Sequence, residues 1–452
     1  MKPGATTIRK HNDTKWYLVS GLLMTVLPLF TIAQSTLKFD LGGKAAPGYT
    51  RVSPATTYTD ALGYGFEGAP VTGTDRGGKD ALHDGFVTSS TPFYFSVKLT
   101  EGNYDVKLTL GDKEGSSATT IRAECRRLMV EKTETTRGAF KTVLFTVHVR
   151  DSIIHPDGAR VRLKPREHAY FHWDNKLTLE FNNNSPKIDA IEITPNTSAT
   201  TVFLAGNSTV VDQAEEPWAA WGQMIPSFFQ PGKIAIANYA ESGESLSGFI
   251  SERRFQKILS LLKTGDYVFV EFAHNDQKQK GEGIGPWTSY TRDLRYVIAE
   301  VRKKGATPVL VTSMNRRNFD STGKVYSTLG DYPPAMRKVA EEEKTALIDL
   351  NAKSKILYEA WGEKESVKAF VHYPANTFPG QDKELKDDTH FNPYGAYEIA
   401  QCIVTGIREN KLPLAAALRS DLPSFDPAHP DPISQWNWPL SPLRPPVKPD
   451  GN

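Results

Sequence analysis

The sequence predicts an α/β domain, with a parallel sheet as the middle of three layers, preceded by an all-β sandwich. At 452 residues the chain is too long for one ordinary domain. Residues 36–194 contain short segments that alternate apolar and polar side chains, whereas beyond residue 200 continuous apolar runs alternate with amphipathic stretches. We therefore expect a sandwich over 34–194, a polar linker over 195–200 and an α/β domain over 201–411.

The first 33 residues have the features of a secretory signal peptide. Basic residues precede the apolar run "WYLVSGLLMTVLPLFTIA", and Thr31 and Ala33 place small side chains where a signal peptidase reads them. The alternative is a retained membrane anchor, for which the run is near the lower length limit. We expect cleavage, a secreted or periplasmic protein and no membrane contact in the mature chain.

Charge and cysteine content argue against a nucleic-acid partner, an anionic membrane partner and a disulfide framework. The 54 lysines and arginines nearly balance the 52 aspartates and glutamates, so nothing favours a nucleic acid or an anionic membrane as the partner. The two cysteines, Cys125 and Cys402, fall in different predicted domains. We expect two free thiols and no disulfide framework.

The N-terminal half is predicted to be β-rich. Strands are expected at 92–100, 104–111, 141–150, 159–165, 176–183 and 188–195, separated by Gly, Asp, Asn and Pro. The opening stretch 39–68 is rich in glycine and tyrosine and resembles the galactose-binding-like jelly rolls found beside carbohydrate-active enzymes. Four aromatic side chains are candidates to stack on sugar rings, but core packing is the favoured interpretation: Tyr58, Tyr64, Phe66 and Trp173.

The C-terminal half is predicted to alternate strands and helices. Strands are expected at 201–205, 234–240, 267–273, 307–313 and 345–350, and helices at 218–229, 247–262, 289–305 and 332–344. Apolar strands separated by amphipathic helices predict a parallel sheet covered on both faces. Such sheets place their chemistry beyond the carboxyl ends of the strands.

Polar residues of unusual type follow the expected strands. Ser208 follows the first strand within "GNSTV", Gly243 the second within "NYAESGESLSGF", and Asn275 the third within "VFVEFAHNDQK". Asp387 and His390 stand near the C-terminus within "DDTHFNPYGAYEIA". Each block alone is a weak signal, and Ser208 or Asn275 alone would be interpreted as a helix cap. The order of the blocks and their shared placement make the set specific.

These four blocks resemble those of the SGNH (GDSL-like) hydrolases, and in detail the rhamnogalacturonan acetylesterase branch. The resemblance covers about residues 200–410 and implies an SGNH-type three-layer α/β/α fold. The sequence departs from the family pattern at Asn207, where aspartate is usual, and at Ala273, where glycine is usual. Asn207 keeps an acceptor oxygen but removes a charge.

The resemblance implies hydrolysis of an ester through an acyl-serine. Ser208 is the expected nucleophile, His390 its base and Asp387 the group that fixes the tautomer of the histidine. Asp387 and His390 are expected on a turn before the last helix, where both face the sheet edge. Asp388 is the competing carboxylate, with the wrong spacing for the family.

The same resemblance assigns the oxyanion hole to three donors. These are the backbone N–H groups of Ser208 and Gly243 and the side-chain amide of Asn275. The mechanism requires no metal and no cofactor. Three other histidines are expected to be structural or on the surface: His83, His274 and His372.

The expected substrate is an acetylated plant cell-wall polysaccharide, rhamnogalacturonan first. Arg316 and Arg317 follow the fourth strand, and arginine recognises carboxylates bidentately, so one of them is a candidate to hold a uronic acid. An internal salt bridge is the alternative role. Two other functions stay open: an acetylesterase of xylan or another glycan, and a carbohydrate-binding protein with an inactive hydrolase-like domain.

The last segment, 412–452, is rich in proline and is predicted to lack long helices and inner strands. Trp436 and Trp438 are expected to pack against the folded chain and brace the two domains.

Overall fold

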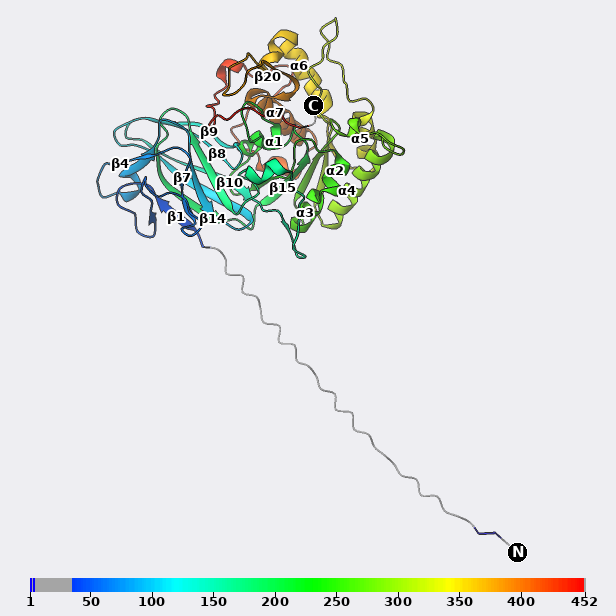
Figure 1. Ribbon diagram of the computed structural model, residues 1–452, viewed down its shortest axis with the longest axis horizontal. Coiled ribbons are helices and arrows are strands. Elements are labelled where there is room, and N and C mark those ends of the chain that lie inside the picture. Colours follow the sequence, from blue (N-terminus) through cyan, green and yellow to red (C-terminus); the bar gives the residue numbers. More distant parts are fainter. Residues whose placement is uncertain (2, 5–34, 451–452) are drawn as a thin grey trace. The chain divides into compact units, whose positions relative to one another are not determined.

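The computed structural model describes residues 1, 3–4 and 35–450 (Figure 1). The predicted signal peptide therefore lies outside the described residues, apart from three positions at its start. From Ser35 onward the chain folds as one compact unit. Within the described part of the chain, every helix is too short or too polar to cross a bilayer.

The N-terminal half is a sandwich of two sheets. One sheet follows the order β10-β7-β14-β1-β2, with β5 paired to β14 and β4 paired to β5, and the other follows β3-β6-β13-β8-β9. The bounds are β1 Leu37–Asp40, β2 Thr50–Arg51, β3 Tyr64–Glu67, β4 Thr72–Asp75, β5 Gly85–Thr88, β6 Phe93–Lys98, β7 Gly102–Gly111, β8 Ser117–Ala123, β9 Arg127–Thr135, β10 Phe140–Val149, β13 Lys176–Asn182 and β14 Ile188–Pro195. A two-stranded pair, β11 Ile153–Ile154 and β12 Ala159–Arg160, and the short helices η1 Ala81–His83 and η2 Pro165–Ala169 complete this half.

Alternation located five of these strands, but the strand expected over 159–165 is wrong. Only the two residues of β12 pair, and Pro165 then occupies the first turn of η2, where its missing N–H costs nothing. The four aromatic residues divide by burial. Phe66 is buried in the sandwich core and Tyr64 packs beside it, whereas Tyr58 and Trp173 are half-buried.

The C-terminal half contains a parallel sheet of order β16-β15-β17-β18-β19. Its strands are β15 Thr200–Gly206, β16 Ile234–Asn238, β17 Tyr267–Glu271, β18 Thr307–Val311 and β19 Ala346–Ile348. The helices are α1 Trp221–Met224, η3 Ile225–Phe228, α2 Leu246–Ser251, α3 Arg254–Leu261, η4 Asp276–Lys278, η5 Pro286–Tyr290, α4 Thr291–Lys303, α5 Tyr332–Glu342, α6 Leu350–Ser366, η6 Val367–Ala369, α7 Pro393–Glu409, η7 Pro413–Ala417 and η8 Ile433–Gln435. An antiparallel pair, β20 Phe370–Tyr373 and β21 Leu385–Phe391, precedes α7.

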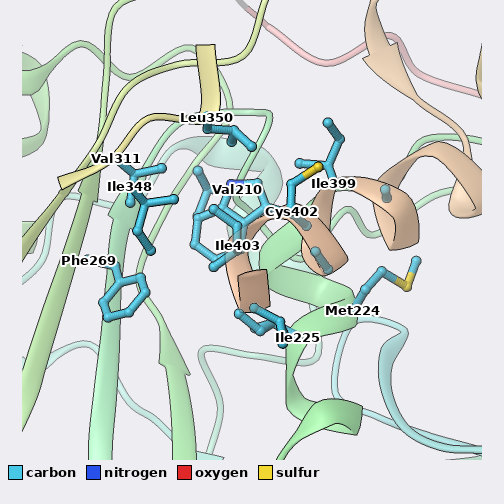
Figure 2. Close-up of a cluster of buried hydrophobic side chains, with 14 of the residues drawn as sticks. Val210, Met224, Ile225, Phe269, Val311, Ile348, Leu350, Ile399, Cys402 and Ile403 are labelled. Atoms are coloured by element: carbon cyan, nitrogen blue, oxygen red, sulfur yellow. The ribbon is translucent and has the colours of Figure 1, made fainter. Parts of the chain in front are cut away.

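Two apolar cores cover the parallel sheet, one on each face. Successive residues of a strand point to opposite faces, so Leu204 packs in the core that includes α7, while Phe203 packs in the core that includes α4. Figure 2 shows the first of these cores, where Ile399, Cys402 and Ile403 of α7 face sheet residues such as Phe269. The fold is the predicted three-layer α/β/α arrangement. Cys125 and Cys402 are both buried free thiols, as expected.

Two expected helices are shorter than the apolar pattern indicates. The stretch 218–229 gives only the single turn α1, which passes into η3 at Ile225. The stretch 247–262 breaks at Arg253, whose φ is +66°, into α2 and α3. Tertiary contacts account for this break, because buried Arg254 at the start of α3 pairs with Glu167 of the sandwich at 2.5 Å.

Buried ion pairs and the C-terminal segment join the two halves. Arg127 of β9 pairs with Asp212 of the C-terminal half at 2.8 Å, and both side chains are buried. The indole of Trp438 lies 3.6 Å from the guanidinium of Arg122 in β8 and donates a hydrogen bond to Glu216 of the C-terminal half. The proline-rich segment thus contacts both domains through one tryptophan.

Candidate active site

Three loops meet at the carboxyl ends of the central strands. Ser208 lies two residues beyond β15, Gly243 follows β16, and Asn275 follows β17. The three strands are neighbours in the sheet, with β15 between the other two. Because parallel strands end at the same edge, the first three predicted blocks come together there.

Ser208, His390 and Asp387 form one hydrogen-bonded line. Nε2 of His390 lies 2.7 Å from Oγ of Ser208, and Nδ1 of the same ring lies 2.8 Å from Oδ2 of Asp387. All three side chains are buried. This geometry allows the imidazole to accept the serine proton while the carboxylate holds the opposite ring nitrogen.

A bulge in β21 lets Asp387 and His390 point the same way. We expected both residues on a turn, but they lie in a strand, where residues three apart face opposite sides of the sheet. The pairing register resolves the difference: Phe370 and Val371, adjacent in β20, pair with Phe391 and Asp387. The intervening residues 388–390 bulge out of the ladder, which redirects the histidine toward Ser208.

The carboxylate of Asp387 is buried and strongly hydrogen-bonded. Its Oδ1 accepts from the backbone N–H groups of Thr389 at 2.9 Å and His390 at 3.0 Å, and Trp218 Nε1 lies 3.3 Å from Oδ2. Burial by itself raises the pKa of Asp387, but the bonds from His390 and the backbone outweigh it and hold the pKa well below its usual range. Asp387 is therefore ionised throughout the neutral range.

The predicted oxyanion donors keep N–H hydrogens available. Within residues 35–450, the backbone N–H groups of Ser208 and Gly243 have no hydrogen-bond acceptor. Gly243 has a φ of +85°, which a side chain would strain. The amide of Asn275 donates one hydrogen to the carbonyl oxygen of Glu244 at 3.0 Å, which leaves its second hydrogen for a ligand.

Asn207 joins the nucleophile loop to a buried carboxylate. Its Oδ1 lies 2.8 Å from Thr209 Oγ1, and that hydroxyl lies 3.0 Å from Glu271 Oε1. Nδ2 of Asn207 has no partner within the described residues. Burial raises the pKa of Glu271 to about 7, although hydrogen bonds from Trp221 and two hydroxyls oppose the rise. The acceptor oxygen that Asn207 keeps is thus the part of its side chain that makes contacts here.

The second departure from the family pattern, Ala273, is buried in the core that includes α4. Its methyl group packs there without disturbing the hydrogen bond of Asn275 to Glu244.

The two candidate arginines have different surroundings. Arg317 pairs with Asp388 at 2.9 Å, so it fits the internal salt bridge that was its alternative role. Arg316 bonds to the hydroxyls of Thr389 and Thr328 and, in the described part of the chain, lacks a carboxylate within ion-pair distance. Arg316 is therefore the candidate that remains for an anionic ligand.

Asp388 and the three remaining histidines take no part in the hydrogen bonds that link Ser208, His390 and Asp387. Asp388 also accepts from His372 at 2.9 Å, so its carboxylate is engaged away from His390. His83 pairs with Asp80 at 2.7 Å in the sandwich. His274 is buried beside the site, and burial, followed by the charge of Arg316, lowers its pKa well below the usual range.

Sequence reasoning missed three basic residues beside the site. Lys278 of η4 lies 3.4 Å from the side-chain oxygen of Asn275, and Lys164 and Arg166 of the sandwich contact the loop that carries Gly243. Lys164 lies at the end of a segment that is predicted to be a strand, and Arg166 follows that segment. No local sequence signal marks Lys164 or Arg166, because only the contact between the domains brings these two residues to the site.

Among the residues that the structure describes, two clusters of potential metal ligands contain no triad residue, and each already includes a cation. Lys257 pairs with Glu101 and Asp151 in the cluster that includes His155. The second cluster comprises Glu167, His172 and Glu241, whose carboxylates pair with Arg254 and Arg166.

Comparisons with known proteins agree with this architecture. Residues 204–397 match the GDSL-like lipase/acylhydrolase family, and residues 37–145 match the galactose-binding domain-like family of β-agarase/YXIM esterase-like proteins. The chain is 43% identical to rhamnogalacturonan acetylesterase RhgT of Bacillus subtilis (strain 168) over 215 residues, which cover 47% of this chain and 91% of that protein.

A second relative extends over both domains. The uncharacterized esterase YxiM of Bacillus subtilis (strain 168) is 27% identical over 348 residues, which cover 74% of this chain and 84% of that protein. The crystal structure of protein YXIM from Bacillus subtilis aligns with 84% of this chain and 99% of that chain, at 25% identity and a TM-score of 0.44. The chain belongs to the GDSL-like lipase/acylhydrolase family and is a carboxylic ester hydrolase with an N-terminal galactose-binding-like domain.

Proposed function

We propose that this protein removes acetyl groups from an acetylated plant polysaccharide, rhamnogalacturonan, through an acetyl-serine intermediate on Ser208. The observation that carries the proposal is the continuous line from Asp387 through His390 to Ser208. The similarity to RhgT, which is named a rhamnogalacturonan acetylesterase, supports the acyl group and the polymer.

The first half of the reaction transfers the acetyl group to the enzyme. Oγ of Ser208 attacks the acetyl carbonyl carbon while its proton passes to Nε2 of His390, 2.7 Å away. Ionised Asp387 stabilises the imidazolium. The tetrahedral intermediate then expels the sugar oxygen, which takes the proton from His390 and leaves as a free hydroxyl group.

The second half returns the enzyme to its starting state. Water attacks the acetyl carbon of acetyl-Ser208 as His390 takes a proton from it, and the second tetrahedral intermediate releases acetate as Oγ regains the proton. In both intermediates the oxyanion accepts hydrogen bonds from the backbone N–H groups of Ser208 and Gly243 and from the amide of Asn275. These donors are fixed by the fold before the charge develops.

Positive charge beside the site favours an acidic polymer over a neutral one. Loss of hydration lowers the pKa of the Lys278 ammonium, and the neighbouring charges of Arg316 and Lys448 lower it further. In the described residues, Lys278 and Arg316 have no carboxylate within ion-pair distance. A uronate of a pectic backbone would supply the missing negative charge.

The assembled triad counts against an inactive, carbohydrate-binding role. Ser208 and His390 lie within hydrogen-bond distance, and the carboxylate of Asp387 is fixed by two backbone N–H groups. A protein that only binds glycans has no need of this geometry.

Release of acetate from acetylated rhamnogalacturonan and from acetylated xylan tests the proposal. We expect the mature chain to release acetate from the pectic polymer at a higher kcat/KM, and Ser208→Ala to release none from either polymer. Ser245→Ala, which changes the nearby N-cap of α2, is the matched control and should keep most of the activity. Absence of acetate release by the unmodified chain would refute the proposal.

Secretion is the second part of the proposal. The basic and apolar N-terminal segment supports cleavage after about residue 33. Mass spectrometry of the chain recovered outside the cytoplasm should show an N-terminus near Gln34. An intact N-terminus in the membrane fraction would favour the anchor.

A further inference from the structure

A turn of the sandwich domain lies against the loop that carries Gly243. Nζ of Lys164 donates a hydrogen bond to the carbonyl oxygen of Ser242 at 2.5 Å, and Nη2 of Arg166 donates to the same oxygen at 2.9 Å. Ser242 belongs to the hydrolase domain, whereas both donors belong to the galactose-binding-like domain. A single backbone oxygen thus accepts from two cationic side chains of the other domain.

This oxygen is part of the peptide group that supplies an oxyanion donor. The carbonyl of Ser242 and the N–H of Gly243 lie in the same rigid plane, because the peptide bond between them is planar. Two charged donors on the oxygen fix the orientation of that plane and polarise the N–H at its other end. In the described part of the chain, the Gly243 N–H itself meets no acceptor and remains available to an oxyanion.

Lys164 also reaches the loop segment that holds the third donor. Its ammonium pairs with the buried carboxylate of Glu244 at 2.5 Å. The carbonyl oxygen of Glu244 accepts from Nδ2 of Asn275 at 3.0 Å. One lysine is therefore linked to the peptide of Gly243 directly and to Asn275 through a single residue.

The turn that presents these side chains is itself anchored to the hydrolase domain. Glu167 accepts from the backbone N–H of Lys164 at 2.8 Å and pairs with Arg254 of α3 at 2.5 Å. Glu167 and Arg254 are both fully buried. Arg166 makes a further ion pair with Glu241, 2.6 Å away on the same loop as Gly243. The position of the turn is thus set by contacts between the two domains.

We propose that Lys164 and Arg166 of the sandwich domain are positioning residues of the oxyanion hole, which act by orienting and polarising the Ser242–Gly243 peptide. The inference rests on the proposed acetyl-serine mechanism. It gives the galactose-binding-like domain a part in the chemical step that is separate from any contact with a glycan.

Kinetics on a small neutral acetate ester separate this role from glycan binding. The hydrolysis of p-nitrophenyl acetate by Lys164→Met should show kcat about tenfold lower and KM within about twofold, because weakening an oxyanion donor costs less than the factor of about 100 or more for removing one. Lys164→Arg retains a charged donor and should restore most of kcat. Lys176→Met, which removes a partly buried lysine paired with Glu67 elsewhere in the sandwich, should leave kcat unchanged.

Selective isotope labelling observes the peptide itself, without substrate. The sequence contains three Ser–Gly bonds, Ser20–Gly21, Ser242–Gly243 and Ser247–Gly248, and the first lies in the predicted signal peptide. With ¹³C at serine carbonyls and ¹⁵N in glycine, the mature chain should show two correlated signals. We expect Lys164→Met to shift the signal of Ser242–Gly243, and the control Lys176→Met to leave that signal in place.

The kinetic and labelling measurements can each overturn the inference. An unchanged Ser242–Gly243 signal in folded Lys164→Met would do so, and so would an unchanged kcat. A fall in activity on the polymer alone would show that Lys164 binds glycan instead. If the unmodified chain releases no acetate from any ester, the proposed function fails, while the labelling experiment still reports on the peptide. Thermal unfolding of each variant establishes that the folded state is being compared.

Discussion

His390 and Ser208 are 182 residues apart in the sequence, yet Nε2 of the histidine lies 2.7 Å from the serine hydroxyl oxygen. The contact depends on two local features. β15 ends at Gly206 and places the serine loop at the sheet edge, and the bulge at residues 388–390 turns the histidine out of its strand. Neither feature alone would bring the two atoms within hydrogen-bond distance.

The two adjacent carboxylates of β21 should differ sharply in their effect on catalysis. Asp387→Asn removes the acceptor for Nδ1 of His390, so kcat should fall by a factor of about 10⁴. Asp388→Asn loses the pair with Arg317 but leaves the triad line intact, so kcat should change by less than about threefold. Hydrolysis of p-nitrophenyl acetate by both variants measures the difference. Equal losses in the two variants would contradict the assignment of Asp387.

Substitution of Arg316 should change substrate preference, whereas substitution of Arg317 should change stability. Arg316→Gln should lower kcat/KM on acetylated rhamnogalacturonan about tenfold and leave p-nitrophenyl acetate unaffected, because its guanidinium has no carboxylate within ion-pair distance in the described residues. Arg317→Gln should instead lower the melting temperature, since it breaks the pair with Asp388 and bonds to Ser366 and the Glu363 carbonyl. Equal losses on both substrates for Arg316→Gln would argue against uronate recognition.

Glu271 should make stability fall as the pH rises. Burial raises the pKa of this carboxyl from 4.5 to about 7, so the folded state binds its proton more tightly than the unfolded state does. The stabilisation is complete below pH 4.5 and is lost as the pH rises through 7. One pKa unit corresponds to about 1.4 kcal/mol, so the shift contributes about 3 kcal/mol to the free energy of unfolding at low pH.

Glu271→Gln removes this titration and keeps the shape of the side chain. The free energy of unfolding of the unmodified chain, relative to the variant, should drop by about 3 kcal/mol between pH 4 and pH 8. Urea denaturation at several pH values measures it. A difference that is constant with pH would mean that Glu271 does not titrate in this range.

The strand pattern and the motif blocks were sufficient to predict the three-layer fold and the three residues that form the hydrogen-bonded line, whose catalytic roles stay predictions. Apolar strands such as 267–273 are continuous because both faces of the sheet are covered, and Ser208, Asp387 and His390 stand in recognisable local contexts. The roles of Lys164 and Arg254 escaped prediction because each depends on a contact between domains. The break in the helix at Arg253 also depends on a contact between domains. The helical periodicity of the sequence continues through this residue and so does not predict the break.

Asn207 offers a test of the residue that departs from the family pattern. Its Nδ2 is buried without a partner in the described chain, and Asn207→Asp would place a carboxylate oxygen there. That carboxylate would share Thr209 with Glu271. We expect a loss of roughly 1–3 kcal/mol of stability at pH 8 and a smaller loss at pH 5, where Glu271 is protonated. A variant more stable than the parent at pH 8 would contradict this explanation.

Trp438 should contribute more to stability than its neighbour Trp436, although the two indoles stack with ring centroids 6.0 Å apart. Trp438 covers the buried guanidinium of Arg122 at 3.6 Å and bonds to Glu216, so it joins the sandwich to the hydrolase domain. Trp436 packs against Tyr397 of the hydrolase domain, with ring centroids 4.6 Å apart.

We therefore expect Trp438→Phe to lower the free energy of unfolding by about 2 kcal/mol, because it removes the hydrogen bond to Glu216 and weakens the cation–π contact. Trp436→Phe keeps an aromatic ring on Tyr397 and should cost less than about 1 kcal/mol. Protease should cut the C-terminal segment of the first variant faster than that of the second. Equal stability of the two variants would show that the contact of Trp438 with Arg122 does not brace the domains.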